Sequence, residues 1–209
     1  MSNRTITITL IIFFILLAAG FMGYYFYTTR DIQKTLPVLG MPGHQIDTFT
    51  FVNQDGKIIT KKDVAGKVYV AEYFFTTCEG MCPKMNDNMV KVYQSFRGNP
   101  KFLILSHSVD PKRDTVEAMK AYGRKFDADA NQWMFLTGDK KRLYDMARES
   151  YLLTTKDDTS HVSIDKDFIH DQRFILVDKT GHIRGQYDGL NKPQLDTLIE
   201  DIHLLLQEK

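Results

Sequence analysis

The chain has 209 residues, of which 43% are hydrophobic, and a formal net charge of +1 at pH 7. This length suits one ordinary globular domain with an appendage. The near-neutral charge gives no indication of a nucleic-acid partner or an acidic substrate. The two cysteines can form one disulfide or part of a metal site, but neither a disulfide framework nor a four-cysteine zinc site.

An uncharged apolar segment at residues 5–27 follows a short tail of residues 1–4. It is long enough to cross a bilayer core of roughly 30 Å, and aromatic residues gather at its end, at Tyr24–Tyr27, as in an interfacial belt. A cleaved signal peptide is the alternative, because Ala18–Gly20 are small enough for a peptidase. We interpret the segment as a single transmembrane anchor, since its apolar character continues past these small residues. In either case we expect the remaining chain to be exported, where a disulfide can persist.

Two further parts are predicted after the anchor. Residues 28–44 contain two prolines and two glycines without a clear period, which indicates a tether. The globular domain is predicted at residues 45–209. It opens with a β-hairpin, in which the strands at 45–52 and 57–60 flank a turn with the sequence Asn-Gln-Asp-Gly.

The rest of the domain alternates strands and helices. Strands are predicted at 68–75, 101–109, 133–136, 174–177 and 182–187, and helices at 82–96, 114–126, 139–151 and 193–207. Strands that alternate with helices imply parallel βαβ units. Together with the closing hairpin and the last helix, this order predicts an α/β domain with a thioredoxin-like fold, an N-terminal β-hairpin and one preceding transmembrane helix.

The cysteines, Cys78 and Cys82, lie in the turn between the first predicted core strand and its helix. Cys82 is at or near the helix N-terminus, where unpaired amide groups favour a thiolate, so we expect its pKa to fall. A thiolate serves either disulfide exchange or soft-metal binding. Thioredoxin-like redox motifs have two residues between the cysteines, whereas this chain has three, which lets both sulfurs face one ion. A structural disulfide or two inert thiols is the third interpretation.

A copper site with two thiolates needs a third ligand, for which imidazole is suited. His170 precedes the closing hairpin, from where a loop can fold over the cysteine turn, and we favour it. His107, at the end of the central strand, ranks second. The other histidines lie in the tether, the polar loop, beside the hairpin turn and on the last helix: His44, His161, His182 and His203.

Four further residues near the cysteines are candidates for a role at the site. Met81 offers a thioether, although we interpret it as packing against the helix start. Glu79 is interpreted as solvated. Asp110 either lines a partner-facing rim or turns the chain. Asp114, with Thr115, is expected to cap the following helix.

Four stretches of the sequence carry a resemblance to a known family: FFTTCEGMCPKM, LSHSVDPKRDTVEAMKAY, WMFLTGD and DFIHDQRFILVDKTGHIRGQYDG. They resemble the SCO/SenC family of membrane-anchored copper proteins, over most of the chain from about Gln45 to Leu190. The family's third copper ligand is a histidine at a fixed distance before the aspartate-x-x-glycine hairpin turn, and that position here is His170. Members often have an aspartate directly before this histidine, whereas this chain has Ile169 there and Asp171 after it.

The resemblance implies a trigonal copper site of Cys78, Cys82 and His170. It also implies a membrane-anchored copper chaperone that helps to build the binuclear copper centre of cytochrome c oxidase, with the globular domain on the extracytoplasmic, periplasmic side. Expected partners are the copper-bearing oxidase subunit and other copper chaperones or thiol reductases. The main alternative is an extracytoplasmic thiol-disulfide oxidoreductase that acts through the Cys78/Cys82 pair. A metal site needs His170, and disulfide exchange does not.

Two weaker alternatives are a redox- or copper-responsive signalling module and a peroxidase. The sequence lacks the threonine-x-x-cysteine motif that a peroxiredoxin-like peroxidase needs.

Overall fold

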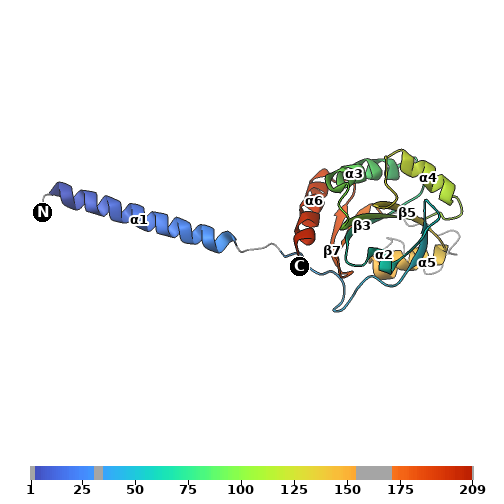
Figure 1. Cartoon of the computed structure of the whole chain (residues 1–209), viewed down its shortest axis with the longest axis horizontal. Helices are drawn as coiled ribbons and strands as arrows, with labels where there is room; N and C mark the ends of the chain where they lie inside the picture. Colours follow the sequence, from blue (N-terminus) through green and yellow to red (C-terminus); the bar gives the residue numbers. More distant parts are fainter. Residues whose placement is uncertain (1–2, 31–34, 154–170, 209) are drawn as a thin grey trace. The chain divides into compact units, whose positions relative to one another are not determined.

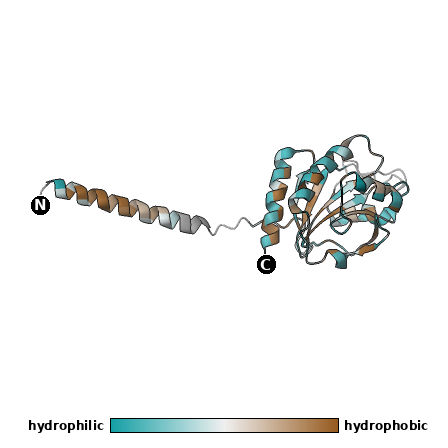
Figure 2. Ribbon diagram, turned by 45° about the horizontal axis from the view of Figure 1, so that its top comes forward, coloured by the Kyte–Doolittle hydropathy of each residue, from teal (hydrophilic) through white to brown (hydrophobic). Residues whose placement is uncertain are grey.

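The computed structural model describes residues 3–30, 35–153 and 171–208, and it divides into an N-terminal unit, Met1–Thr35, and a compact unit, Leu36–Lys209. The N-terminal unit holds helix α1 (Asn3–Arg30). Its segment Arg4–Tyr25 has a mean hydropathy of 2.5 and is long and apolar enough to cross a membrane. The apolar stretch is visible along the helix in Figure 2. By length and composition, the helix indicates membrane anchoring.

The compact unit is built on one seven-stranded sheet, in the order β2-β1-β5-β4-β3-β6-β7. Its strands are β1 (Thr50–Asn53), β2 (Ile58–Thr60), β3 (Val68–Phe74), β4 (Phe102–Ser108), β5 (Trp133–Thr137), β6 (Arg173–Val177) and β7 (Ile183–Asp188). The strands β3, β4 and β5 run parallel. The hairpins β1–β2 and β6–β7 add antiparallel strands at the two edges.

Helices cover both faces of the sheet (Figure 1). The helices are α2 (Lys61–Val64), α3 (Met81–Phe96), α4 (Val116–Arg124), α5 (Lys140–Asp145) and α6 (Lys192–Gln207), and a π-helical turn, η1 (Met146–Ser150), extends α5. Apolar residues of α3, α4 and α6 pack on one face, and those of α2, α5 and η1 pack on the other. The helix predicted at 139–151 is therefore α5 plus a π-helical turn, and α2 is an addition.

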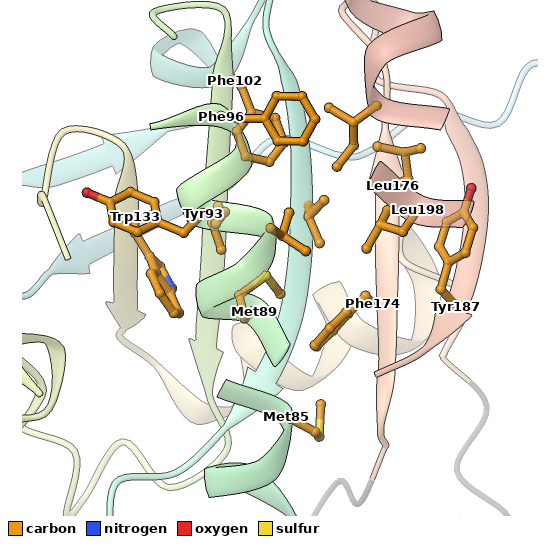
Figure 3. Packing of buried hydrophobic residues seen from close by; sticks show 14 of the residues in the cluster. Met85, Met89, Tyr93, Phe96, Phe102, Trp133, Phe174, Leu176, Tyr187 and Leu198 are labelled. Carbon is orange, nitrogen blue, oxygen red and sulfur yellow. The ribbon is translucent and has the colours of Figure 1, made fainter. Parts of the chain in front are cut away.

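Two apolar cores result, one on each face of the sheet. Figure 3 shows part of the first, to which Met85 and Met89 of α3, Phe174 of β6 and Leu198 of α6 all belong. We call this the α3 core. The second contains alternate residues of the same strands, such as Leu103 and Leu105, and we call it the α5 core. Because β3 and β4 are buried on both faces, β3 is apolar except at Glu72 and β4 begins with four apolar residues in a row, without alternation.

The compact unit begins before residue 45, where the sequence predicts the domain to start. Leu36 is buried, and Leu39 pairs with Ile183 at the free edge of β7. The Arg184 guanidinium donates to the Leu36 carbonyl at 2.7 Å. These two contacts hold residues 36–39 against the sheet. They leave no periodic signal in a segment rich in proline and glycine.

His107 of β4 is fully buried among aromatic rings of the α5 core. Its ring stacks on Tyr73 with centroids 5.1 Å apart, and Nε2 lies 3.1 Å from the Tyr151 hydroxyl. Nδ1 has no hydrogen-bond partner among the described residues. Burial lowers the pKa of His107 to about 3, because this environment disfavours the imidazolium.

A buried carboxylate fastens the loop after β3 to the end of β4. Asp114 is fully buried and accepts hydrogen bonds from the Thr76 amide at 3.0 Å and the Thr76 hydroxyl at 2.6 Å. Its other oxygen accepts from the Ser108 hydroxyl at 2.5 Å. The cap of α4 is therefore Thr115 alone, whose side chain accepts from the Ala118 amide. The prediction that Asp114 and Thr115 together cap this helix is therefore wrong for Asp114, because its carboxylate binds Thr76 and Ser108 instead.

His107 should make the compact unit sensitive to acid. Between its folded pKa of about 3 and its ordinary value of 6.5, the unfolded state binds the proton more tightly, so stability is lost as the pH falls through this window. The loss amounts to about 5 kcal/mol. Urea unfolding of the full-length chain in detergent, followed by fluorescence of the single buried Trp133, should show a weaker pH dependence for His107→Gln. Parallel curves for the two proteins would contradict this.

Removal of the Asp114 carboxylate should loosen the loop at Thr76. Asp114→Ala leaves three donors without their acceptor, the buried Ser108 hydroxyl and the half-buried amide and hydroxyl of Thr76, which costs about 3 kcal/mol of unfolding free energy. Asp114→Asn, which keeps one acceptor oxygen, should lose less. Amide hydrogen exchange of the full-length chain should report faster exchange at Thr76 in the alanine variant. Unchanged protection at this amide would show that the carboxylate does not hold the loop.

Candidate metal centre

The two cysteines lie where β3 turns into α3. β3 is buried along its whole length and ends at Phe74, and the Cys78 amide donates to the Phe75 carbonyl at 3.2 Å, which closes a turn. Gly80 is the N-cap of α3, and Cys82 is the second residue of this helix. Both cysteines are free. The predicted strand-turn-helix placement of the pair is present.

The two thiols have different environments. Cys78 is half-buried, and Cys82 is 6% exposed. Burial alone raises the pKa of Cys78, but hydrogen bonds from the Cys82 thiol and from amides of the first helical turn outweigh this, and the net pKa is lowered. Burial and the Cys78 hydrogen bond raise the pKa of Cys82 to about 12. The prediction of a lowered Cys82 pKa is therefore wrong. The pKa is lowered at Cys78 instead, because its sulfur accepts hydrogen bonds from backbone amides at the start of α3.

Both thiols line one small cavity of about 220 Å³. Its described wall consists mainly of aromatic, aliphatic and sulfur-containing side chains: Tyr73, Phe74, Phe75, Cys78, Met81, Cys82, Met85 and Val109, with Gly80 and Asp171. The Cys82 amide donates to the Cys78 sulfur at 3.5 Å. Two thiols that face one largely apolar space suit a soft cation, which prefers sulfur to oxygen ligands.

The third predicted ligand, His170, lies outside the described residues, as does His161. Among the residues that the structure describes, no three histidine, cysteine, aspartate or glutamate side chains form a group that could hold a metal ion. The described residue next to His170 is informative, however. Asp171 lines the cavity of the two cysteines, so the described chain resumes at this site.

The four described histidines lie elsewhere. His107, the second candidate, belongs to the α5 core, whereas the cysteines belong to the α3 core on the opposite face of the sheet. His44 contacts the Ser150 carbonyl through Nε2, and His182 contacts the Thr180 hydroxyl through Nδ1. His203 packs on Phe96 of α3. The structure thus separates these four histidines from the cysteine pair.

Asp171 is fixed by the arginine that opens β6. The Arg173 guanidinium donates to both carboxylate oxygens of Asp171 at 2.5–3.0 Å, and the Arg173 amide adds a bond of 2.8 Å. The Asp171 side chain is only 9% exposed. This pair holds the chain at the cavity wall.

Behind Cys82 lies a small group of buried polar residues that the sequence analysis did not single out. The side-chain amide of Asn86 donates through Nδ2 to the Cys82 carbonyl at 3.0 Å and to the Tyr122 hydroxyl at 2.8 Å. Glu72 of β3 accepts from Ser106 at 2.6 Å, and burial raises its pKa to about 7. A lone acidic residue inside the apolar run of β3 was the available signal for this group.

Two remaining candidates near the cysteines, Asp110 and Glu79, do not line the cavity. Asp110 turns the chain after β4, because its carbonyl accepts from the amides of Arg113 and Asp114. Glu79 is exposed. Asp114 accepts bonds from Thr76, two residues before Cys78, and the only sequence signal for this contact is an aspartate next to the capping threonine.

A family model described as SCO1/SenC matches residues 41–207. The chain is similar to the SCO1 protein homolog of Bacillus subtilis, with 29% identity over 161 residues, 76% of this chain and 81% of that protein.

Two solved structures are similar in fold. BsSco, described as a member of the Sco family of cytochrome c oxidase assembly proteins with a disulfide switch, is 28% identical with a TM-score of 0.67 and covers 82% of this chain and 99% of its own. ScoI of Bradyrhizobium japonicum, solved with copper bound, is 24% identical with a TM-score of 0.60 and covers 78% of this chain and 99% of its own. These likenesses confirm the predicted thioredoxin-like fold, and the match over residues 41–207 shows that the chain belongs to the SCO1/SenC family.

Proposed function

We propose that this protein is a membrane-anchored copper chaperone that binds copper through Cys78, Cys82 and His170 and delivers it to the copper-bearing subunit of cytochrome c oxidase. The observation that carries the proposal is the shared cavity. Both thiols line it, and the residue after His170 lines it too. Two thiolates and one imidazole suit copper in either oxidation state.

The relatives support the choice of cargo and of recipient. ScoI of Bradyrhizobium japonicum binds copper in its solved structure, and BsSco belongs to a family of cytochrome c oxidase assembly proteins. Delivery to an oxidase requires the cavity to face the compartment in which the oxidase receives copper. We therefore place the compact unit on the extracytoplasmic side, with α1 as the anchor.

A second candidate function rests on the asymmetry of the thiols. Cys78 is the more accessible sulfur and has the lowered pKa, as expected of an attacking thiol, and Cys82 is positioned to resolve a mixed disulfide. In this thiol-disulfide oxidoreductase, the Cys78 thiolate attacks a partner disulfide and releases one partner thiolate. Cys82 then displaces the second, so the pair is oxidised and the partner reduced.

Copper loading distinguishes the two functions. The full-length chain in detergent should bind one equivalent of copper when Cu(I) and Cu(II) are added separately, and Cys78→Ser with Cys82→Ser should abolish binding. His170→Ala should weaken Cu(II) binding by at least about tenfold, because an imidazole ligand is lost. His203→Ala, on an exposed position of α6, is the matched control and should bind copper normally.

The oxidoreductase would be favoured if the protein took up no stoichiometric copper but reduced a model disulfide equally well with and without His170.

A further inference from the structure

The backbone of one residue, Phe75, contacts both cysteines. Its carbonyl accepts a hydrogen bond from the Cys78 amide at 3.2 Å. Its own amide donates to the Cys82 sulfur, which lowers the pKa of Cys82 against the larger, opposite effect of burial. A shift of the backbone at Phe75 would therefore change the surroundings of both cysteines at once.

The peptide unit between Phe75 and Thr76 is held by the buried Asp114 carboxylate. Oδ1 of Asp114 accepts from the Thr76 amide at 3.0 Å and from the Thr76 hydroxyl at 2.6 Å. The Thr76 amide and the Phe75 carbonyl belong to the same peptide unit, which is planar and rigid. A bond that fixes the N–H of this unit also fixes the direction of its C=O. Asp114 thereby orients the acceptor that closes the cysteine turn.

Asp114 is itself fixed relative to the sheet. It is fully buried, its other oxygen accepts from the Ser108 hydroxyl at 2.5 Å, and its amide donates to the Asp110 carbonyl at 2.9 Å. Ser108 is the last residue of β4 and lies opposite Phe74, the last residue of β3. The carboxylate thus has a defined position relative to the strand from which the cysteine turn departs.

The turn in this arrangement stabilises the reduced pair more than a disulfide. Both cysteines are free in the structure. The Cys78 sulfur accepts from backbone amides at the start of α3, among them the Cys82 amide at 3.5 Å, and the Cys82 sulfur accepts from Phe75. A charged thiolate is a stronger hydrogen-bond acceptor than a neutral disulfide sulfur. Bonds of this kind therefore favour the reduced state of the couple.

We propose that Asp114 is a positioning residue of the cysteine site and acts through Thr76 to raise the reduction potential of the cysteine couple. This inference rests on the proposed function, since it takes the pair as the working site of copper delivery or of disulfide exchange. The reaction that measures the couple is balanced. Two glutathione thiols reduce the Cys78–Cys82 disulfide to two thiols and leave as glutathione disulfide. Loss of the carboxylate shifts this equilibrium toward the protein disulfide.

The test is a thiol-disulfide equilibrium that needs no copper. Full-length protein in detergent, freed of metal by a chelator, is equilibrated with reduced and oxidised glutathione at fixed pH. Thiol alkylation followed by mass spectrometry gives the reduced fraction. The equilibrium constant for reduction should fall about tenfold in Asp114→Ala, which is about 30 mV for a two-electron couple. Thr76→Val keeps the shape of the side chain and removes only the hydroxyl donor, so it should fall by about fivefold.

Two further variants separate positioning from a general loss of stability. Thr76→Ser restores the hydroxyl and should keep the equilibrium constant within about twofold of the wild type. Asp201→Ala removes another buried carboxylate, which accepts from the Tyr187 hydroxyl at 2.7 Å and does not line the cavity of the cysteines. It is the matched control for Asp114→Ala and should leave the equilibrium constant unchanged.

The Thr76 variants decide the proposal even if Asp114→Ala does not fold. Equal equilibrium constants for the wild type and Thr76→Val, or a shift toward the reduced pair, would overturn it. A shift in Asp201→Ala as large as that in Asp114→Ala would also overturn it, because the effect would then be one of stability alone. Failure of the proposed copper function looks different, since the wild type would take up no copper while its glutathione equilibrium could still be measured.

Discussion

The burial of β3 on both faces and both edges is the constraint on which the site depends. It pairs in parallel with β4 along its whole length and antiparallel with β6, so its end cannot shift without breaking two ladders. Tyr73 lies opposite His107 and Phe74 opposite Ser108 in this register. The turn that carries the cysteines therefore leaves the sheet at a fixed point.

The same two ladders bring the other parts of the site to that point. Because β4 is parallel to β3, the loop after Ser108 leaves the sheet at the same end as the cysteine turn, and Asp114 in this loop binds Thr76. Because β6 is antiparallel, its first residues lie where β3 ends, and Asp171 reaches the cavity wall. Three segments distant in the sequence thus meet at one cavity.

The sequence predicts much of this arrangement, because its signals are local. The apolar run of β3, the helical spacing after Cys82 and the turn residues between the last strands locate the elements. The face of His107 was not predictable in the same way. A strand buried on both faces lacks the alternation of polar and apolar residues that would tell one face from the other. The inward turn of Asp114 and the pairing of Leu39 with Ile183 depend on tertiary contacts, which no local pattern records.

The thiols show how a tertiary contact alters a local rule. A helix N-terminus favours a thiolate, but its amides point outward from the first turn, toward Cys78. Cys82 is within the helix and inside the α3 core, so burial outweighs its position in the sequence. One thiol is then accessible and the other is enclosed, an arrangement that serves attack on a disulfide as well as capture of an ion. The choice between the two depends on the third group at the cavity.

The hydrogen bonds of Asp171 limit its role toward that third group. A carboxylate that orients a ligating imidazole needs a free oxygen for the ring N–H. Both Asp171 oxygens already accept from Arg173, whose guanidinium also donates to Gln186 of β7. Using Asp171 to orient the imidazole of His170 would weaken this pair at the start of β6. The position before the histidine, where related proteins often have an aspartate, is Ile169 in this chain. Asp171 therefore serves to hold the start of β6 at the cavity wall, through its bonds to Arg173.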